Sequence, residues 1–118
     1  MRQPPAIESY GAGGFRVAGV WRPGSLLIVQ DQPYTWRPAK LAEVGVEDFA
    51  AVLTAPAGAV EFVLLGTGAV QALPSRAVRD ALRAAGLGLE FMASDTATRL
   101  HNVLSSEGRL FATALMAV

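Results

Sequence analysis

The chain has 118 residues, of which 52% are hydrophobic and 17% charged, and its ten basic residues balance ten acidic ones. This length and composition predict one domain with a core of its own, which excludes intrinsic disorder. A net charge of zero provides no long-range field to gather nucleic acid or an anionic membrane, so neither is an expected partner.

The sequence contains no cysteine, which excludes disulfide bonds, thiol nucleophiles and thiolate metal sites. A reducing compartment suits such a chain, so the cytoplasm is its expected location. The first 15 residues lack the apolar core of a signal peptide, and no apolar run reaches the roughly 20 residues that span a bilayer. High apolar content at zero net charge favours self-association, so a homo-oligomer is one expected state.

The first quarter of the chain predicts a loose lead-in, a short edge strand and an antiparallel hairpin with a type II turn. These elements are, in order, residues 1–6, residues 7–10, and residues 15–21 paired with 26–29 across a turn at 22–25. The glycines at 11, 13 and 14 indicate a further turn between the edge strand and the hairpin.

The rest of the chain predicts strands alternating with helices. The expected order is an edge strand at 34–36, a helix from 46 or 47 to 53, a strand at 60–65, a helix at 76–85, a strand at 87–92, a helix capped by Ser94 or Asp95, and a strand at 110–116. The apolar run 60–65 is expected to be the central strand, parallel to 87–92. The fold class is therefore α/β, shading to α+β. We expect one compact domain over residues 1–118, in which the antiparallel hairpin joins a parallel βαβαβ segment in mixed sheets with about three helices.

Gly66, Thr67 and Gly68 follow the predicted central strand. Backbone without Cβ atoms at the carboxyl end of a parallel strand is where open α/β sheets bind ligands. Six residues separate Gly68 from the next helix, and there is no Walker lysine, so this is not a phosphate-binding loop. Ligand contact and a purely structural tight turn both stay open.

A second polar group lies on and after the last predicted helix. Asp95 and Arg99 are four residues apart and can pair on one helix face. One interpretation is a solvated face; the other is a polar patch that shares a pocket with the glycine turn. The candidate binding residues are accordingly Gly66, Thr67, Gly68, Arg99, Asn102, Glu107 and Arg109.

No catalytic residue is predicted. His101, the only histidine, has Ser105, Ser106 and Asp95 nearby, but all four lie on one predicted helix and no G-x-S-x-G elbow is present. A packed histidine is the better interpretation. One histidine and no cysteine also argue against a transition-metal site, and no cofactor is predicted.

Aromatic residues are concentrated in the first third of the chain. Phe15 is expected in the core. Trp21 and Trp36 fit either packing or a docking surface, because exposed tryptophans often anchor interfaces.

Several short motifs follow one another in a recognisable order. They read IESYGAGGFRVAG at residues 7–19, GSLLI at 24–28, a lone Trp36, LLGTG at 64–68 and FMASDTATRLHNVLSSEGRL at 91–110. Together they resemble the domain-of-unknown-function family whose eukaryotic members include the mitochondrial NADH dehydrogenase complex I assembly factor 3. The resemblance implies a compact α/β domain with a mixed sheet, no established enzymatic activity, and a role in complex assembly with protein partners.

Two functions are therefore consistent with the sequence. The first is a non-enzymatic interaction or assembly protein with an unidentified protein partner. The second is a small-molecule-binding domain, or an enzyme, with its pocket at the Gly66-Thr67-Gly68 turn.

Overall fold

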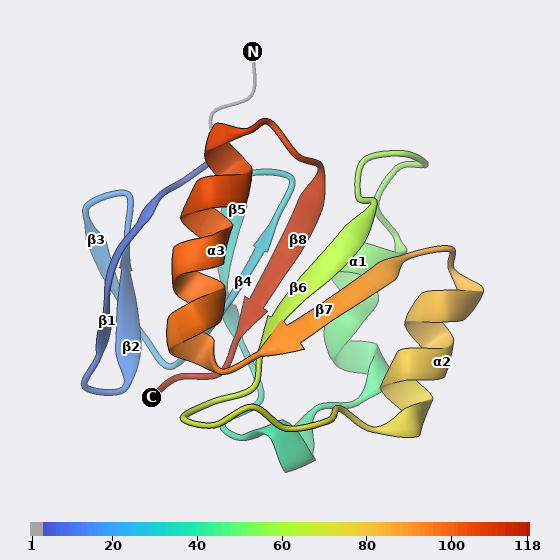
Figure 1. Cartoon of the computed structure of the whole chain (residues 1–118), viewed down its shortest axis with the longest axis horizontal. Helices are drawn as coiled ribbons and strands as arrows, with labels where there is room; N and C mark the ends of the chain where they lie inside the picture. Colours follow the sequence, from blue (N-terminus) through green and yellow to red (C-terminus); the bar gives the residue numbers. More distant parts are fainter. Residues whose placement is uncertain (1–3) are drawn as a thin grey trace.

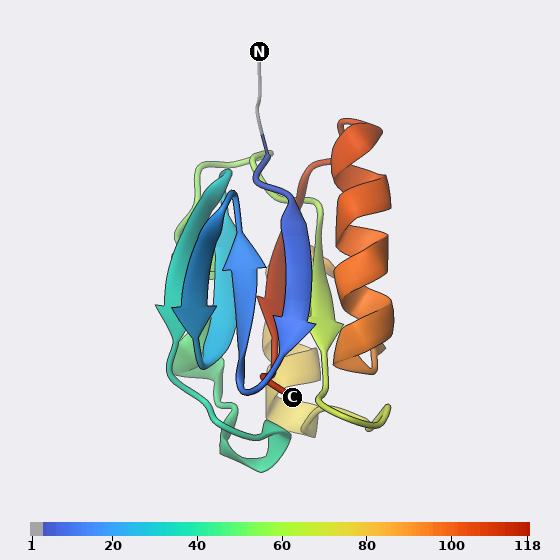
Figure 2. The ribbon, with the colours of Figure 1, turned by 90° about the vertical axis from the view of Figure 1, so that its left-hand side faces the viewer.

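The computed structural model describes residues 4–118 and shows two β-sheets, the larger of which is covered on both faces (Figures 1 and 2). The smaller sheet is antiparallel and consists of β1 (Ile7–Gly11), β2 (Gly14–Val17) and β3 (Val20–Pro23). The larger sheet is mixed and consists, in spatial order, of β5 (Gln32–Trp36), β4 (Ser25–Val29), β8 (Phe111–Leu115), β6 (Phe62–Gly66) and β7 (Gly88–Met92). The α/β class with mixed strand directions is confirmed.

The helices agree closely with the sequence pattern. They are the 3₁₀ turns η1 (Leu41–Glu43) and η2 (Val46–Phe49), the short α1 (Ala50–Leu53), α2 (Arg76–Ala84) and α3 (Ser94–Ser106). The Ser75 hydroxyl accepts a hydrogen bond from the Val78 N–H at 3.3 Å and caps α2, as serine at this position predicts. The expected cap of α3 at Ser94 or Asp95 is wrong, because Ala93 is the capping residue and the Ser94 hydroxyl is bonded elsewhere.

The predicted pairing of residues 15–21 with 26–29 is also wrong. Ala18 and Gly19 both have positive φ, 49° and 81°, and form a two-residue turn that divides the first segment into β2 and β3. Such a turn matches the twist of antiparallel strands, so β3 pairs with β2 rather than with β4. Gly24, with φ 84°, then carries the chain into the larger sheet. Alanine rarely adopts positive φ, which is why the sequence did not indicate this turn.

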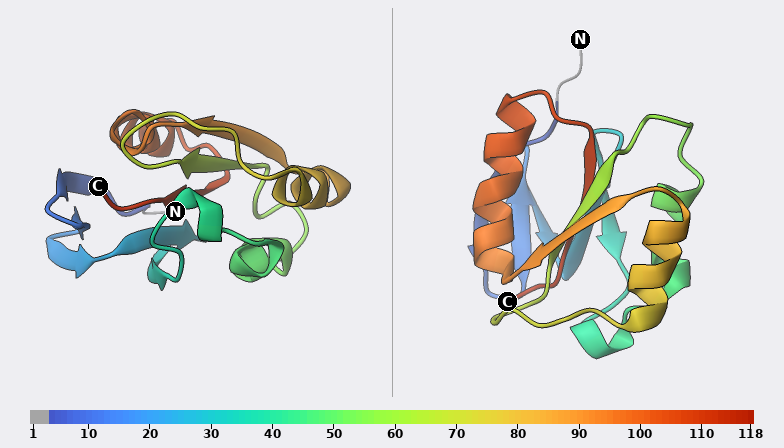
Figure 3. Two further views of the ribbon diagram at one scale, coloured as in Figure 1. Left: turned by 90° about the horizontal axis from the view of Figure 1, so that it is seen from below. Right: turned by 45° about the vertical axis from the view of Figure 1, so that its right-hand side comes forward.

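The last strand, not residues 60–65, is the centre of the larger sheet. β8 lies antiparallel to β4 and parallel to β6, and β6 in turn lies parallel to β7. The predicted parallel pair of β6 and β7 around α2 is confirmed, but it occupies one side of the sheet. Figure 3 shows β7 at the margin of the sheet and α2 beside it.

Side chains alternate between two hydrophobic cores, one on each face of the larger sheet. Val63 and Leu65 point to the face covered by α1 and α2, whereas Leu64 points to the face covered by α3 and the smaller sheet. Phe15 and Trp36 are both buried, so the docking interpretation is wrong for Trp36, while Trp21 is 40% exposed.

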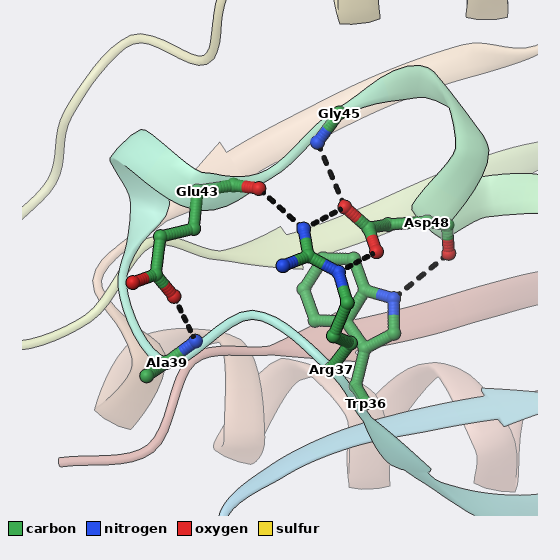
Figure 4. A network of polar contacts seen from close by, with 6 residues as sticks. All are labelled: Trp36, Arg37, Ala39, Glu43, Gly45 and Asp48. Carbon is green, nitrogen blue, oxygen red and sulfur yellow. Dashed lines mark hydrogen bonds and ion pairs between the residues drawn. The ribbon is translucent and has the colours of Figure 1, made fainter.

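A polar network fixes the end of β5 against η2 (Figure 4). The indole N–H of Trp36 donates to the Asp48 carbonyl at 2.8 Å, and the Arg37 guanidinium donates to both carboxylate oxygens of Asp48 at 2.8 and 2.7 Å. The Asp48 carboxylate also accepts from the Gly45 N–H. The hydrogen bonds from Arg37 hold the pKa of Asp48 below its usual value, and the bond from Gly45 acts in the same direction.

Asp48→Asn is expected to lower the free energy of unfolding by about 1 kcal/mol at pH 7. Because the pKa of Asp48 is lower in the folded state, its stabilising effect is present above the unfolded value of 3.8 and is lost as pH falls through the folded pKa. Urea unfolding should therefore show a difference between wild type and variant at pH 7 that disappears at low pH. The exposed Asp80→Asn is the control, and an equal difference at both pH values would contradict this assignment.

Candidate functional site

The Gly66-Thr67-Gly68 turn is bonded to its surroundings through its backbone. The Met116 N–H donates to the Gly66 carbonyl at 2.9 Å, and the Thr67 N–H donates to the Met92 carbonyl at 2.8 Å. The Gly68 N–H donates to the Ser94 hydroxyl at 3.0 Å, and the Ser94 N–H returns a bond to the Gly68 carbonyl at 2.8 Å. The turn thus joins the ends of β6, β7 and β8 to the start of α3.

The hydroxyl of Thr67 fixes the loop that follows. It donates to the Val70 carbonyl at 2.7 Å, with the Met92 carbonyl as a second acceptor at 3.1 Å, and it accepts from the Ala72 N–H at 3.2 Å. Thr67 is only 6% exposed. Its hydroxyl therefore serves the loop and is not directed at solvent.

Packing explains why Gly66 has no side chain. A Cβ atom there would lie 2.7 Å from Leu115 Cδ2, 2.9 Å from Ser94 Oγ and 3.0 Å from Ser94 Cα. Gly68 is required for a different reason, because its φ is 112°. Side chains fill the space at Gly66, so this part of the turn has no room for a ligand.

Asn102 is a structural clamp on β1. Its amide oxygen accepts from the Ile7 N–H at 2.9 Å, and its amide nitrogen donates to the Ile7 carbonyl at 2.8 Å. The side chain thus bonds the backbone of Ile7 as a neighbouring strand would, which ties α3 to the beginning of the smaller sheet.

The remaining candidates do not gather at the turn. The Arg99 side chain is 64% exposed and lies 3.9 Å from Asp95, a loose pair on the outer face of α3. Glu107 is an exposed residue at the end of that helix. The Arg109 guanidinium lies 5.1 Å from the centre of the Phe62 ring, and Phe62 is at the opposite end of β6 from the turn. The structure does not bring the predicted residues into one pocket.

His101 is packed in the core with 1% exposure. One ring nitrogen, Nε2, lies 2.9 Å from the Pro5 carbonyl, and Nδ1 lies 2.7 Å from the Thr113 hydroxyl. A carbonyl only accepts, so Nε2 carries the proton and Nδ1 accepts from Thr113. Burial lowers the pKa of His101, which keeps the ring neutral. Its bond to Pro5 also ties down the described part of the expected loose lead-in; residues 1–3 lie outside the described part of the chain.

A cavity of about 220 Å³ does open beside the turn. Its lining residues come from β1, the loop after β6, the first turn of α3 and the end of the chain: Tyr10, Gly68, Ala69, Asp95 and Val118. Gly68 is the only predicted candidate among them. Within residues 4–118 there is no cluster of histidine, aspartate and glutamate that could hold a metal ion.

An exposed apolar segment at this end of the molecule was not predicted from the sequence. Residues 69–73, called here the apolar loop, connect the turn to α2, and Val70 and Leu73 are 70% and 61% exposed. Gln71 is the only polar residue of the five. An uncharged AVQAL segment between a glycine turn and a helix-capping serine was the available signal, since loop tips are ordinarily polar.

One family model matches nearly the whole chain. The model for "Protein of unknown function (DUF498/DUF598)" matches residues 7–116. An uncharacterized protein of Rhodobacter capsulatus is 39% identical over 110 residues, which cover 93% of this chain and 82% of that protein.

Solved structures share the fold over nearly the whole chain. A crystal structure described as an outer membrane protein from Bartonella henselae superimposes with a TM-score of 0.89 at 30% identity, covering 99% of this chain and 98% of that one. An NMR structure from Bordetella pertussis, described as an Mth938-like domain, gives 0.77 at 25% identity, covering 95% and 85%.

Proposed function

We propose a non-enzymatic role for this protein, as an interaction or assembly protein in the cytoplasm. The chain belongs to the DUF498/DUF598 family of proteins of unknown function. Its contact surface is the apolar loop, residues 69–73. The observation that supports this role is that the loop is fixed by the Thr67 hydroxyl and yet exposes Val70 and Leu73.

Exposed aliphatic side chains on a fixed loop favour a protein partner for two reasons. Burying them against an apolar surface gains free energy in proportion to the area removed from water. Because the backbone from Thr67 to Ala72 is already bonded in place, binding loses less conformational entropy than it would with a flexible loop. The side chains of Val70 and Leu73 are thus held in position for contact with a partner before binding.

The nature of the partner follows from the family resemblance alone. Assembly of the membrane-bound NADH dehydrogenase is the role known for the mitochondrial branch, so a subunit or assembly partner of that enzyme is the candidate to test first. Of the helices in the described residues, none has the length and apolar character to cross a membrane.

A small-molecule site is the second candidate function, and the cavity beside Gly68 favours it. At about 220 Å³ it is smaller than the roughly 300–1,000 Å³ typical of ligand pockets. Ala69→Trp, which would fill the cavity, should abolish any thermal shift that a metabolite panel produces. Absence of a shift with the wild-type chain would remove this candidate.

The experiment for the interaction role compares two variants at endogenous expression. Val70→Ser with Leu73→Ser removes both anchors, and Val103→Ser, at a residue that is 52% exposed on α3, is the matched control. Affinity capture should recover one defined partner with the wild type and with the control, and at least about tenfold less with the double variant. A chain that is recovered alone, or a partner that the double variant retains, would contradict the proposal.

A further inference from the structure

The edge strand β7 has a backbone and charge pattern that fits a second copy of this chain. It is an edge strand of the larger sheet, and no strand among residues 4–118 pairs with its outer side (Figure 1). We propose that two copies pair antiparallel through β7 about a two-fold axis at Leu89, so that their larger sheets become one continuous sheet.

The hydrogen bonds of β7 show which of its residues are available for such pairing. The Gly88 N–H donates to the Glu61 carbonyl at 3.1 Å, and the Met92 carbonyl accepts from Thr67 at 2.8 Å. Backbone groups of alternate residues point to opposite sides of a strand, so Gly88 and Met92 point inward and Leu89 and Phe91 point outward. An axis at Leu89 places two outward residues opposite each other as a hydrogen-bonded pair.

The same axis brings opposite charges together. Glu90 then lies opposite Gly88 of the second copy, a residue that has no side chain and lies beside Phe62 of β6. Above Phe62 lies the guanidinium of Arg109. Each Glu90 therefore approaches the corner formed by Gly88, Phe62 and Arg109 of the other copy, and the two-fold symmetry makes this contact twice.

Other registers and other occupants fit less well. An axis at Glu90 would place two carboxylates directly opposite each other, which is unfavourable. An axis at Phe91 would pair Glu90 with Met92 and leave the charge without a partner in the second copy. A foreign extended peptide would also add to the edge, but only a second copy supplies the matching charge at the matching position in both directions.

The surface beside β7 supports a contact larger than one strand pair. Glu90, Phe62 and Arg109 border a groove of about 170 Å³ whose other wall is Leu100 and Leu104 of α3. Leu89 and Phe91 on the opposite face are only partly buried. β7 also contains neither proline nor lysine, the residues that usually prevent edge-to-edge pairing, whereas Pro33 lies in the other edge strand, β5.

Charge exchange tests this dimer. In sedimentation experiments over a concentration series, Glu90→Arg and Arg109→Glu should each raise the dissociation constant about tenfold or more, because each places like charges together. The double variant Glu90→Arg/Arg109→Glu should return to within about threefold of wild type. The melting temperature of each variant, measured at a concentration where all forms are monomeric, separates association from folding. A substitution that affects only the folding of the monomer changes this melting temperature and leaves the dissociation constant unchanged.

Two results would overturn the proposal. One is a wild-type chain that sediments as a monomer up to about 1 mM, where any specific dimer should appear. The other is a double variant that associates no better than the single ones. Val70→Ser with Leu73→Ser should leave the dimer unchanged, so failure of the dimer and failure of the interaction role are distinguishable.

A cross-link provides an independent measurement of the register. The chain has no cysteine, so Leu89→Cys introduces a single thiol. Residues in a hydrogen-bonded antiparallel pair have Cα atoms about 5.5 Å apart, within the range that a disulfide bridges. Oxidation should link the two copies at position 89 and should not link Val103→Cys. Equal cross-linking of the two variants, or none in Leu89→Cys, would contradict the axis at Leu89.

Discussion

Gly66→Ala is expected to lower the free energy of unfolding by about 2–3 kcal/mol, the cost of overpacking a filled core. The added methyl group would lie 2.7 Å from Leu115 Cδ2 and 3.0 Å from the backbone of Ser94. The leucine side chain can rotate, but the Ser94 backbone is bonded to Gly68 and cannot easily move. Urea unfolding measures the change.

The control for this variant is Gly86→Ala. Gly86 has φ 77° and open space around it, so alanine there tests the backbone effect without a steric clash. Its expected cost is smaller, about 1 kcal/mol. If Gly66→Ala unfolds like wild type, the turn has unused space and the case for a ligand at Gly66 returns.

Asn102→Ala is expected to cost about 2–3 kcal/mol, because it leaves both the N–H and the carbonyl of Ile7 without their partner. Ile7 is 3% exposed, so water does not readily replace the lost bonds. Asn102→Asp keeps the acceptor for the Ile7 N–H and loses the donor to its carbonyl, so about half of the cost is expected.

This series separates a structural role from a binding role for Asn102. Chemical unfolding gives the stability, and amide exchange at Ile7 and Ser9 reports whether the start of β1 opens. A variant with unchanged stability and unchanged exchange would show that the clamp is dispensable, and Asn102 would again be a candidate for ligand contact.

The elements that the sequence predicted well are those with strong local signals. α2 begins at a capping serine and ends near Gly86, and its apolar stripe faces the core. β6 is a short apolar run between turns, as a strand buried on both faces should be. The error in the first quarter arose because Ala18 adopts positive φ, a conformation that alanine rarely takes.

The candidate site was harder to predict because it depends on contacts far apart in sequence. Asn102 is polar and lies on a helix, yet its partner is Ile7, 95 residues away. Thr67 was expected at a pocket, but its hydroxyl serves Val70 and Ala72 in its own loop. The roles of Thr67 and Asn102 are explained by the packing of β1, β6 and α3. A sequence pattern has the same appearance whether a polar residue supports the fold or binds a ligand.

The glycine turn is a rigid support that holds the apolar loop in place. Native-state amide hydrogen exchange at Gly68 and Ala72 tests it most directly, because their N–H groups donate to Ser94 and Thr67. We expect both amides to exchange at least about a hundredfold more slowly than in an unstructured chain, and Thr67→Ala to remove the protection at Ala72 alone. Exchange of both amides at the unstructured rate in the wild-type protein would contradict the claim.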